Sequence, residues 1–161
     1  MTSNTNHKPK AASLLKTIYV LVLIMPLPAF AGLGDSADSV LADQLNMLAR
    51  TTIIPARNYT VYQLASPLGV VVREYVSSSG KVFAVSWRGP FVPEMHRILA
   101  KRFELYSLEM QKRDIRMFGR SALNIRAPLL VLQTVGHMRA YNGRAYDPSL
   151  LPAGVSIDEI R

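Results

Sequence analysis

The stretch Val71–Pro90, with the sequence VVREYVSSSGKVFAVSWRGP, decides the fold that we predict for this chain. Two runs rich in β-branched and aromatic residues flank Ser77–Gly80, and serines with glycine between such runs are typical of a turn. Gly89 and Pro90 end the second run, because proline cannot donate a hydrogen bond to a neighbouring strand. The stretch therefore predicts an antiparallel hairpin.

The length of the turn decides which side chains of the hairpin share a face. A three-residue loop that ends in a left-handed Gly80 pairs Tyr75 with Phe83, whereas a two-residue loop pairs Val76 with Phe83. We favour the three-residue loop. On the face that receives a helix, its register places Val71, Arg73, Tyr75, Phe83, Val85 and Trp87.

Patterns on both sides of the hairpin extend the sheet and add a helix. Tyr59–Ala65 predicts a further strand, which makes a three-stranded meander with Val70–Val76 and Lys81–Trp87. After the meander, apolar residues recur at spacings of four, four, three and four, the pattern of an amphipathic helix of roughly five turns. The helix ends by Gly119, and its apolar residues are Met95, Leu99, Phe103, Tyr106 and Met110.

The last third of the chain predicts further short strands and a final helical turn. Leu129–Val135 and Met138–Tyr141 are the predicted strands, with a turn at Gly136–His137 between them. Asn142–Gly143 is a hairpin signal, which predicts a second turn after the second strand. Ser156–Glu159 has the spacing of a capping box.

Residues 32–58 precede the meander and predict a short helix, with an adaptable N-terminal arm as the alternative. A β-branched run before Pro55 ends this helix. Its apolar stripe consists of Val40, Leu41, Leu45 and Leu48. Residues 59–161 form a single α+β domain: an antiparallel sheet of about five short strands with one long amphipathic helix packed on it.

The first 31 residues have the three parts of an export signal. A polar start with three lysines and no acid precedes the apolar run Thr17–Met25, and Ala29–Ala31 is a small-x-small cleavage site. Two prolines interrupt the apolar region, whereas a membrane span needs roughly twenty apolar residues. We therefore predict a signal peptide over residues 1–31, cleavage between Ala31 and Gly32, and a periplasmic or secreted location. An uncleaved membrane anchor is the alternative.

The composition excludes several classes of site and partner. The chain has 161 residues, a net charge of +8 and no cysteine. The lack of cysteine excludes a disulfide scaffold, a thiol nucleophile and a cysteine-ligated zinc site. Removal of the signal peptide takes away three lysines, so the exported domain is only moderately basic. This charge, the export signal and the lack of aromatic side chains among the basic residues disfavour nucleic acid as a partner.

The candidate site is centred on Glu74, the only acid inside an apolar strand. Because an unpaired buried charge is costly, we expect a structural lock between Glu74 and an arginine of a neighbouring element. A ligand contact and an acid–base role in a small hydrolase or lyase are the alternatives. The candidate residues are Arg73, Glu74, Tyr75, Arg139, Tyr141 and Arg144.

Other patterns that carry chemistry are weak. His96 and His137 have no histidine or cysteine at metal-ligand spacing, and Glu94 is a poor partner because helical residues two apart point about 200° away from each other. The chain has no G-x-S-x-G nucleophile elbow, and Ser79–Lys81 lacks the first glycine of a phosphate loop. We therefore predict no metal, no cofactor and no catalytic residue.

The predicted long helix carries a basic flank. Acidic residues are interspersed with the basic ones, so a solvated and partly self-paired helix face is the first interpretation. The alternative is weak attraction to a membrane surface or to polysaccharide phosphate, through every residue of the flank except Arg102. The flank consists of Arg97, Lys101, Arg102, Lys112, Arg113, Arg116 and Arg120.

Two strings resemble a known family: VVREYVSSSGKVFAVSWRGP at Val71–Pro90 and GRAYDPSLLPAGVSIDEI at Gly143–Ile160. The family is the bacterial exported family called domain of unknown function 2844, and the resemblance covers Tyr59–Ile160. Where we expect a glycine in the helix, this chain has Ala100, which raises helix propensity. The resemblance implies a small exported domain and no assigned activity.

Together, these features favour an exported, non-enzymatic binding or accessory module of the cell envelope. Its partner is an unidentified envelope component or protein. The enzyme that uses Glu74 and polyanion binding by the basic helix are the alternatives.

Overall fold

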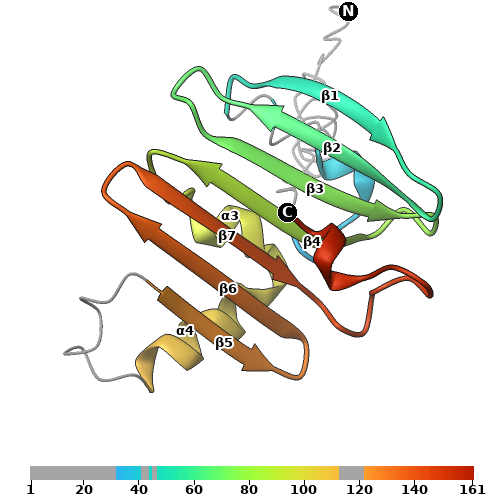
Figure 1. The fold of residues 1–161 in the computed structure, drawn as a ribbon. Helices are drawn as coiled ribbons and strands as arrows, with labels where there is room; N and C mark the ends of the chain where they lie inside the picture. Colours follow the sequence, from blue (N-terminus) through green and yellow to red (C-terminus); the bar gives the residue numbers. More distant parts are fainter. Residues whose placement is uncertain (1–31, 41–43, 45–46, 113–121) are drawn as a thin grey trace, which may run out of the picture.

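The computed structural model describes residues 32–40, 44, 47–112 and 122–161 of the chain (Figure 1). These residues form a seven-stranded antiparallel sheet with the strand order β1-β2-β3-β4-β7-β6-β5. The strands are β1 (Arg50–Pro55), β2 (Tyr59–Ala65), β3 (Val71–Ser77), β4 (Val82–Gly89), β5 (Ala122–Ala127), β6 (Leu130–His137) and β7 (Ala140–Tyr146). The helical elements are η1 (Ala37–Ser39), α3 (Met95–Leu99), η2 (Ala100–Arg102), α4 (Phe103–Gln111) and η4 (Ile157–Glu159).

The two faces of the sheet are covered differently (Figure 1). The helices α3 and α4 lie on one face, which we call the helix face. The C-terminal segment Asp147–Arg161 lies on the opposite face, which we call the arginine face, and covers only part of it. The predicted α+β class is therefore confirmed.

The sheet has seven strands rather than about five, because the sequence patterns of both edge strands are weak. β1 is exposed at every residue except the half-buried Thr51, and β5 contains Asn124 and Arg126. Edge strands lack the apolar alternation of central strands, since they are less buried. β1 lies within residues 32–58 and coincides with the β-branched run before Pro55 that we expected to end the helix; the N-terminal helix is not confirmed. Leu41 and Leu45 of its stripe, like the signal peptide and Gly119, lie outside the described residues.

β7 runs through Asn142 and Gly143, so the hairpin predicted there is wrong. Gly143 lies opposite Trp87 of β4, and a Cβ at this position would overlap the indole ring. A Cβ at Gly136 of β6 would likewise overlap the ring of Tyr141, which lies opposite it in β7. Both glycines permit the close approach of an aromatic ring rather than a turn.

The turn between β6 and β7 is at Met138 and Arg139 instead of Gly136–His137. His137 pairs with Ala140 across this two-residue turn, and Arg139 has a φ of 64°. Arginine is rare in the left-handed region, so the sequence carries no signal for this turn.

The turn between β3 and β4 has the predicted three residues, but the register shifts just beyond it. Gly80 has a φ of 75° and ends the loop as expected. Val76 pairs with Val82, whereas Tyr75 pairs with Ala84. Phe83 is therefore the extra residue of a β-bulge, which places two residues of β4 opposite one of β3.

Beyond the bulge, the hairpin has the register predicted for a two-residue loop, which we did not favour. Trp87 lies opposite Val72, and Arg73 lies opposite Ser86. Since successive residues of a strand point to opposite faces, Arg73 and Trp87 lie on different faces. Arg73 is thus removed from the apolar side chains among which the predicted register placed it.

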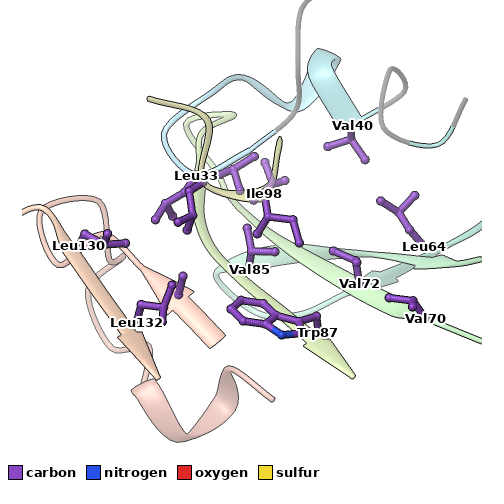
Figure 2. Close-up of a cluster of buried hydrophobic side chains, with 14 of the residues drawn as sticks. Leu33, Val40, Leu64, Val70, Val72, Val85, Trp87, Ile98, Leu130 and Leu132 are labelled. Atoms are coloured by element: carbon purple, nitrogen blue, oxygen red, sulfur yellow. The ribbon is translucent and has the colours of Figure 1, made fainter. Parts of the chain in front are cut away.

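The main apolar core lies between the sheet and the helices (Figure 2). Trp87, Ile98 and Leu99 are all buried in this cluster, so the predicted burial of the tryptophan is confirmed. Four further residues of the predicted stripe pack against it: Met95, Phe103, Tyr106 and Met110. A second, smaller core lies beneath the C-terminal segment and consists of Val61, Tyr75, Phe83, Ala84, Val155 and Ile160.

The predicted continuous helix is interrupted at Ala100. This residue has a φ of 39° and a ψ of −114°, a conformation that residues with a Cβ rarely adopt. Glycine adopts it without strain. The expectation that alanine raises helix propensity here is wrong, because the backbone at Ala100 is not helical.

A buried ion pair fixes the start of the C-terminal segment. Asp147 is buried, and its Oδ2 accepts hydrogen bonds from Nε of Arg102 at 2.8 Å and from Nη2 of Arg102 at 2.5 Å. Its Oδ1 accepts from the backbone N–H and the hydroxyl of Ser149 at 2.9 and 2.6 Å. Arg102, predicted as part of the basic flank, therefore joins the helices to the C-terminal segment.

The capping box predicted at Ser156–Glu159 is present and also binds β2. The N–H of Ser156 donates to Oε1 of Glu159, and the hydroxyl of Tyr59 donates to its Oε2, both at 2.8 Å. Burial, with help from Glu159, raises the pKa of Tyr59 to about 12. The hydrogen bonds from Ser156 and Tyr59 lower the pKa of Glu159.

We expect Ala100→Gly to raise the free energy of unfolding by about 1 kcal/mol, because glycine relieves the strained backbone. Urea denaturation measures the difference. Ala140→Gly in β7 is the matched control, and it should lower stability because Ala140 has no positive φ to relieve. A lower urea midpoint for Ala100→Gly than for wild type would contradict the proposed backbone strain at Ala100.

The burial of Tyr59 and the hydrogen bonds that Glu159 accepts from Ser156 and Tyr59 should make stability depend on pH at both extremes. Because the pKa of Tyr59 is raised from 10.0 to about 12, its contribution is present below pH 10 and lost as pH rises toward 12. Because the pKa of Glu159 is lowered from 4.5, its contribution is present above pH 4.5 and lost as pH falls below its folded-state pKa. Chemical denaturation should therefore show a flatter profile for Glu159→Gln at acidic pH, and a smaller change at alkaline pH because the burial of Tyr59 remains. Asp158→Asn is the control, and identical profiles for wild type and Glu159→Gln would rule out this account.

Candidate functional site

A continuous row of polar side chains crosses the arginine face. In an antiparallel sheet, residues directly opposite each other point to the same face. The register places one residue of each strand in this row, which we call the polar row. From β1 across to β5, it consists of Thr52, Gln63, Arg73, Ser86, Arg144, Gln133 and Asn124.

Two arginine–glutamine pairs flank the centre of the polar row. Arg73 and Arg144 both lie opposite Ser86, which is buried. Nε of Arg73 donates to Oε1 of Gln63 at 2.9 Å, and Nε of Arg144 donates to Oε1 of Gln133 at 2.9 Å. Equivalent bonds therefore hold the two guanidinium groups on either side of Ser86.

The C-terminal segment binds the same two arginines. Nη1 of Arg73 donates to the main-chain oxygen of Arg161, and Nη1 of Arg144 donates to the carbonyl oxygen of Ile157 at 2.7 Å. The hydroxyl of Tyr75 donates to the main-chain oxygen of Arg161 at 2.8 Å and accepts from its N–H at 2.9 Å. The end of the segment is thus fixed to the face by three side chains.

These bonds orient both arginines before any ligand arrives. Nε and Nη1 of Arg73 and Arg144 are occupied, whereas Nη2 of each makes no hydrogen bond to another described residue. A planar guanidinium group with two of its nitrogens fixed keeps its third donor in a set direction. Such a donor suits an oxygen of a phosphate or a carboxylate.

A cavity of about 550 Å³ opens over this part of the arginine face. Ile160 and Arg161 of the C-terminal segment line one side of it. The residues that line it include four arginines and no aspartate or glutamate. Its polar lining from the sheet includes Arg73, Ser86, Arg88, Gln133, Asn142 and Arg144.

The structure brings three of the predicted site residues together. Arg73, Tyr75 and Arg144 all bind the C-terminal segment on the arginine face. Glu74 lies on the helix face opposite Val85 and is 0% exposed. The sheet therefore separates Glu74 from Arg73 and Arg144.

The other two predicted residues lie elsewhere. Tyr141 points to the helix face, where its ring packs against Gly136, and Arg139 is exposed in the turn between β6 and β7. Neither lines the cavity. The structure therefore does not bring Glu74 and the other candidate residues together in one pocket.

The described residues of the basic flank pair with acidic residues of the chain. Besides the buried Arg102–Asp147 pair, these pairs are Arg97–Glu94 at 2.7 Å, Lys101–Asp35 at 3.0 Å and Lys112–Glu109 at 2.6 Å. This pairing agrees with a solvated, self-paired helix face. Arg113, Arg116 and Arg120 lie outside the described residues.

His96 and His137 occupy surface positions. Nε2 of His96 comes within 3.8 Å of Oε2 of Glu94, closer than predicted, because Glu94 precedes the helix and has an extended backbone. Glu94 also pairs with Arg97. His137 is the last residue of β6 rather than a turn residue. Nowhere in the described parts of the chain do three His, Cys, Asp or Glu residues gather as metal ligands.

Sequence reasoning missed six polar residues of the cavity: Ser86, Arg88, Gln133, Thr134, Asn142 and Arg161. Ser86 and Arg88 are two positions apart at the end of an apolar strand, and Asn142 and Arg144 have the same spacing in β7. Polar residues at alternate positions are the signal of one polar face. The misplaced turn at Asn142–Gly143 hid this signal in β7.

Comparison with known proteins places the chain in a family. No curated protein and no solved structure matches it. A family model matches residues 29–160, a range that contains all the strands described above. This match agrees with the resemblance of Val71–Pro90 and Gly143–Ile160. The chain belongs to the family described as protein of unknown function (DUF2844).

Proposed function

We propose that the protein is a non-enzymatic binding module of the cell envelope that holds a small anionic ligand on its arginine face. The observation that carries the proposal is the cavity of about 550 Å³, whose lining includes four arginines and no acidic residue. A volume of this size suits a small molecule. Neighbouring positive charges repel one another, and a bound anion offsets that repulsion.

The floor of the cavity combines charge with neutral hydrogen-bonding groups. Nη2 of Arg73 and Arg144 and the exposed guanidinium group of Arg88 suit phosphate or carboxylate oxygens. Ser86 and Asn142 add a hydroxyl and an amide, which bind hydroxyl groups of a ligand. We therefore expect an anionic sugar or a similar polar ligand that carries phosphate or carboxylate.

Binding is better supported than acid–base catalysis by Glu74. Glu74 is fully buried on the helix face, whereas the cavity lies on the arginine face. Among the residues that line the cavity, no aspartate, glutamate or histidine is present to move a proton. Anion binding needs only the arginines and polar groups that the cavity contains.

The sheet is also a better-supported anion site than the basic helix. Arg97, Lys101 and Lys112 each pair with an acidic side chain, which reduces their attraction for an external anion. Arg88 forms no ion pair with any residue that the structure describes. Among the described residues, the attraction for an anion is therefore strongest at the cavity.

The location in the envelope rests on the signal peptide predicted over residues 1–31. The folded domain takes in the chain from Gly32 onward: Gly32 is buried against α3, and the N–H of Leu33 donates to the carbonyl oxygen of Ile98 at 3.0 Å. The family match begins at Ala29, close to the proposed cleavage site. In the described ranges, no helix is both long and apolar enough to cross a membrane.

We expect the protein from the periplasm of cells that express the full chain to begin at Gly32. Signal peptidase recognises small residues at Ala29 and Ala31, so Ala31→Glu should block processing. Intact mass spectrometry measures both proteins. A wild-type mass that retains residues 1–31 would exclude cleavage and favour the membrane anchor.

We expect glucose 6-phosphate and inorganic pyrophosphate to bind the protein, and glucose to bind much more weakly, in isothermal titration calorimetry. Arg88→Gln should weaken binding of both anions by about tenfold or more, because a hydrogen bond to a charged group contributes about 1.5–3 kcal/mol. Arg88 is exposed and makes no ion pair with a described residue, so its loss should not change the fold.

Arg126→Gln is the matched control for this experiment. Arg126 is also an exposed arginine of the same face, in β5, but it does not line the cavity. Its substitution should leave the affinity for both anions unchanged. Failure of both anions to bind wild type, or equal losses in Arg88→Gln and Arg126→Gln, would refute the proposed function.

A further inference from the structure

Several loops lie at one end of the sheet, and they carry large apolar side chains. The register places Arg50, Ala65, Val71, Gly89 and Ala140 at this end. The segments next to these residues therefore all lie at the same end of the sheet. Their large apolar residues, which we call the apolar tips, are Leu48, Leu68, Phe91, Val92 and Met138.

The apolar tips include the three most exposed large apolar side chains among the described residues. Met138 is 93% exposed, Leu48 is 80% exposed and Leu68 is 72% exposed. Phe91 and Val92 are also exposed, and with Met138 they surround a shallow pocket of about 350 Å³. Contact of such side chains with water is unfavourable, and their grouping marks an interaction surface.

The opposite end of the sheet has a different composition. Its turns are Ala56–Asn58, Ser78–Gly80 and Pro128–Leu129, in which small and polar residues predominate. Leu129 is the large apolar residue of these turns, and it is only 39% exposed. The apolar tips are thus a property of one end rather than of the loops in general.

Arginines lie around the apolar tips. Arg50, Arg88 and Arg139 are exposed at this end, and none of them forms an ion pair with another described residue. Glu94, the acidic residue of the loop after β4, is paired with Arg97 at 2.7 Å. In the described part of the chain, this end therefore combines exposed apolar groups with positive charge.

We propose that this end of the molecule docks on the surface of an anionic phospholipid bilayer. The apolar tips enter the boundary between the headgroups and the acyl chains, while Arg50, Arg88 and Arg139 contact headgroup phosphates. The inference rests on the proposed function in one respect: the anion in the cavity is then a lipid headgroup. Arg88 connects the two sites, because it lies at this end and also lines the cavity.

A bilayer fits this surface better than a protein partner does. The apolar tips come from separate loops, whereas a stable protein interface buries a contiguous apolar core patch. An anionic leaflet complements the arginines and accepts isolated apolar side chains at a depth of a few ångströms. Both parts of the surface are then in contact with matching chemistry.

Co-sedimentation with vesicles tests the apolar tips. The protein purified from cells that express the full chain is mixed with phosphatidylcholine vesicles, with or without about 30 mol % phosphatidylglycerol. We expect binding to the anionic vesicles and a partition coefficient about tenfold lower for the double variant Leu68→Gln with Met138→Gln. Leu129→Gln, at the opposite end, is the matched control and should bind like wild type.

A second pair of variants tests the arginines. Arg50→Gln with Arg139→Gln should weaken binding to the anionic vesicles, while Arg57→Gln at the opposite end should not. Raising the salt concentration to about 0.15 M and above should weaken wild-type binding, because it screens these charges. All the substituted side chains are exposed, so each variant should keep the wild-type melting temperature.

The outcomes separate this inference from the proposed function. Neither double variant changes the cavity lining, so both should keep the wild-type affinity for glucose 6-phosphate. Binding of glucose 6-phosphate without binding of vesicles overturns the docking and leaves the proposed function intact. Binding of vesicles without binding of glucose 6-phosphate refutes anion binding in the cavity and supports the docking. Equal vesicle binding by wild type and both double variants overturns the docking. A wild-type dimer in sedimentation velocity that Leu68→Gln with Met138→Gln dissociates also overturns it, since the tips then contact a second copy.

Discussion

The register between β3 and β4 decides the chemistry of both faces of the sheet. The bulge at Phe83 keeps the three-residue turn. Farther along the hairpin, it changes which residues of β3 and β4 share a face. Glu74 and Trp87 consequently lie in the core, while Arg73 and Ser86 reach the arginine face. Without the bulge, Arg73 would lie among apolar side chains under the helices, where a charge is costly. The cavity therefore depends on one inserted residue.

The C-terminal segment makes a cavity out of what is otherwise an open sheet face. It is held at its start by the buried Arg102–Asp147 pair and at its end by the contact between Tyr75 and Arg161. The first contact links it to the helices, and the second links it to the sheet. Because both ends are fixed, the segment also fixes Arg144, whose guanidinium group binds its carbonyl oxygens. The C-terminal segment, which lines one side of the cavity, and the guanidinium group of Arg144 are thus positioned together.

Features with strong local signals were predictable, and features set by contacts between distant residues were not. The meander, the turn at Gly80 and the capping box each follow from residues close together in sequence. Gly143 is different, because its role is set by the ring of Trp87 on another strand. Ala100 likewise gives no local sign that α3 ends there. For the candidate site, Arg73 and Arg144 were found. Arg73 and Glu74 are successive residues of one strand, so they point to opposite faces in any register. The placement of Arg144 on the same face as Arg73 depends on the bulge, which no local pattern predicts.

The pairing of β4 with β7 has a consequence for the way in which the chain folds. β1–β4 and β5–β7 are each meanders of consecutive strands, whereas β4 and β7 are far apart in sequence. Hairpins form within microseconds, while a non-local pairing must first overcome the entropy of closing a long loop. We therefore expect the two meanders to form early and their joining to limit the folding rate. The close contact of Trp87 with Gly143 lies at this junction, so we expect it to affect the speed of folding as well as the stability of the folded state.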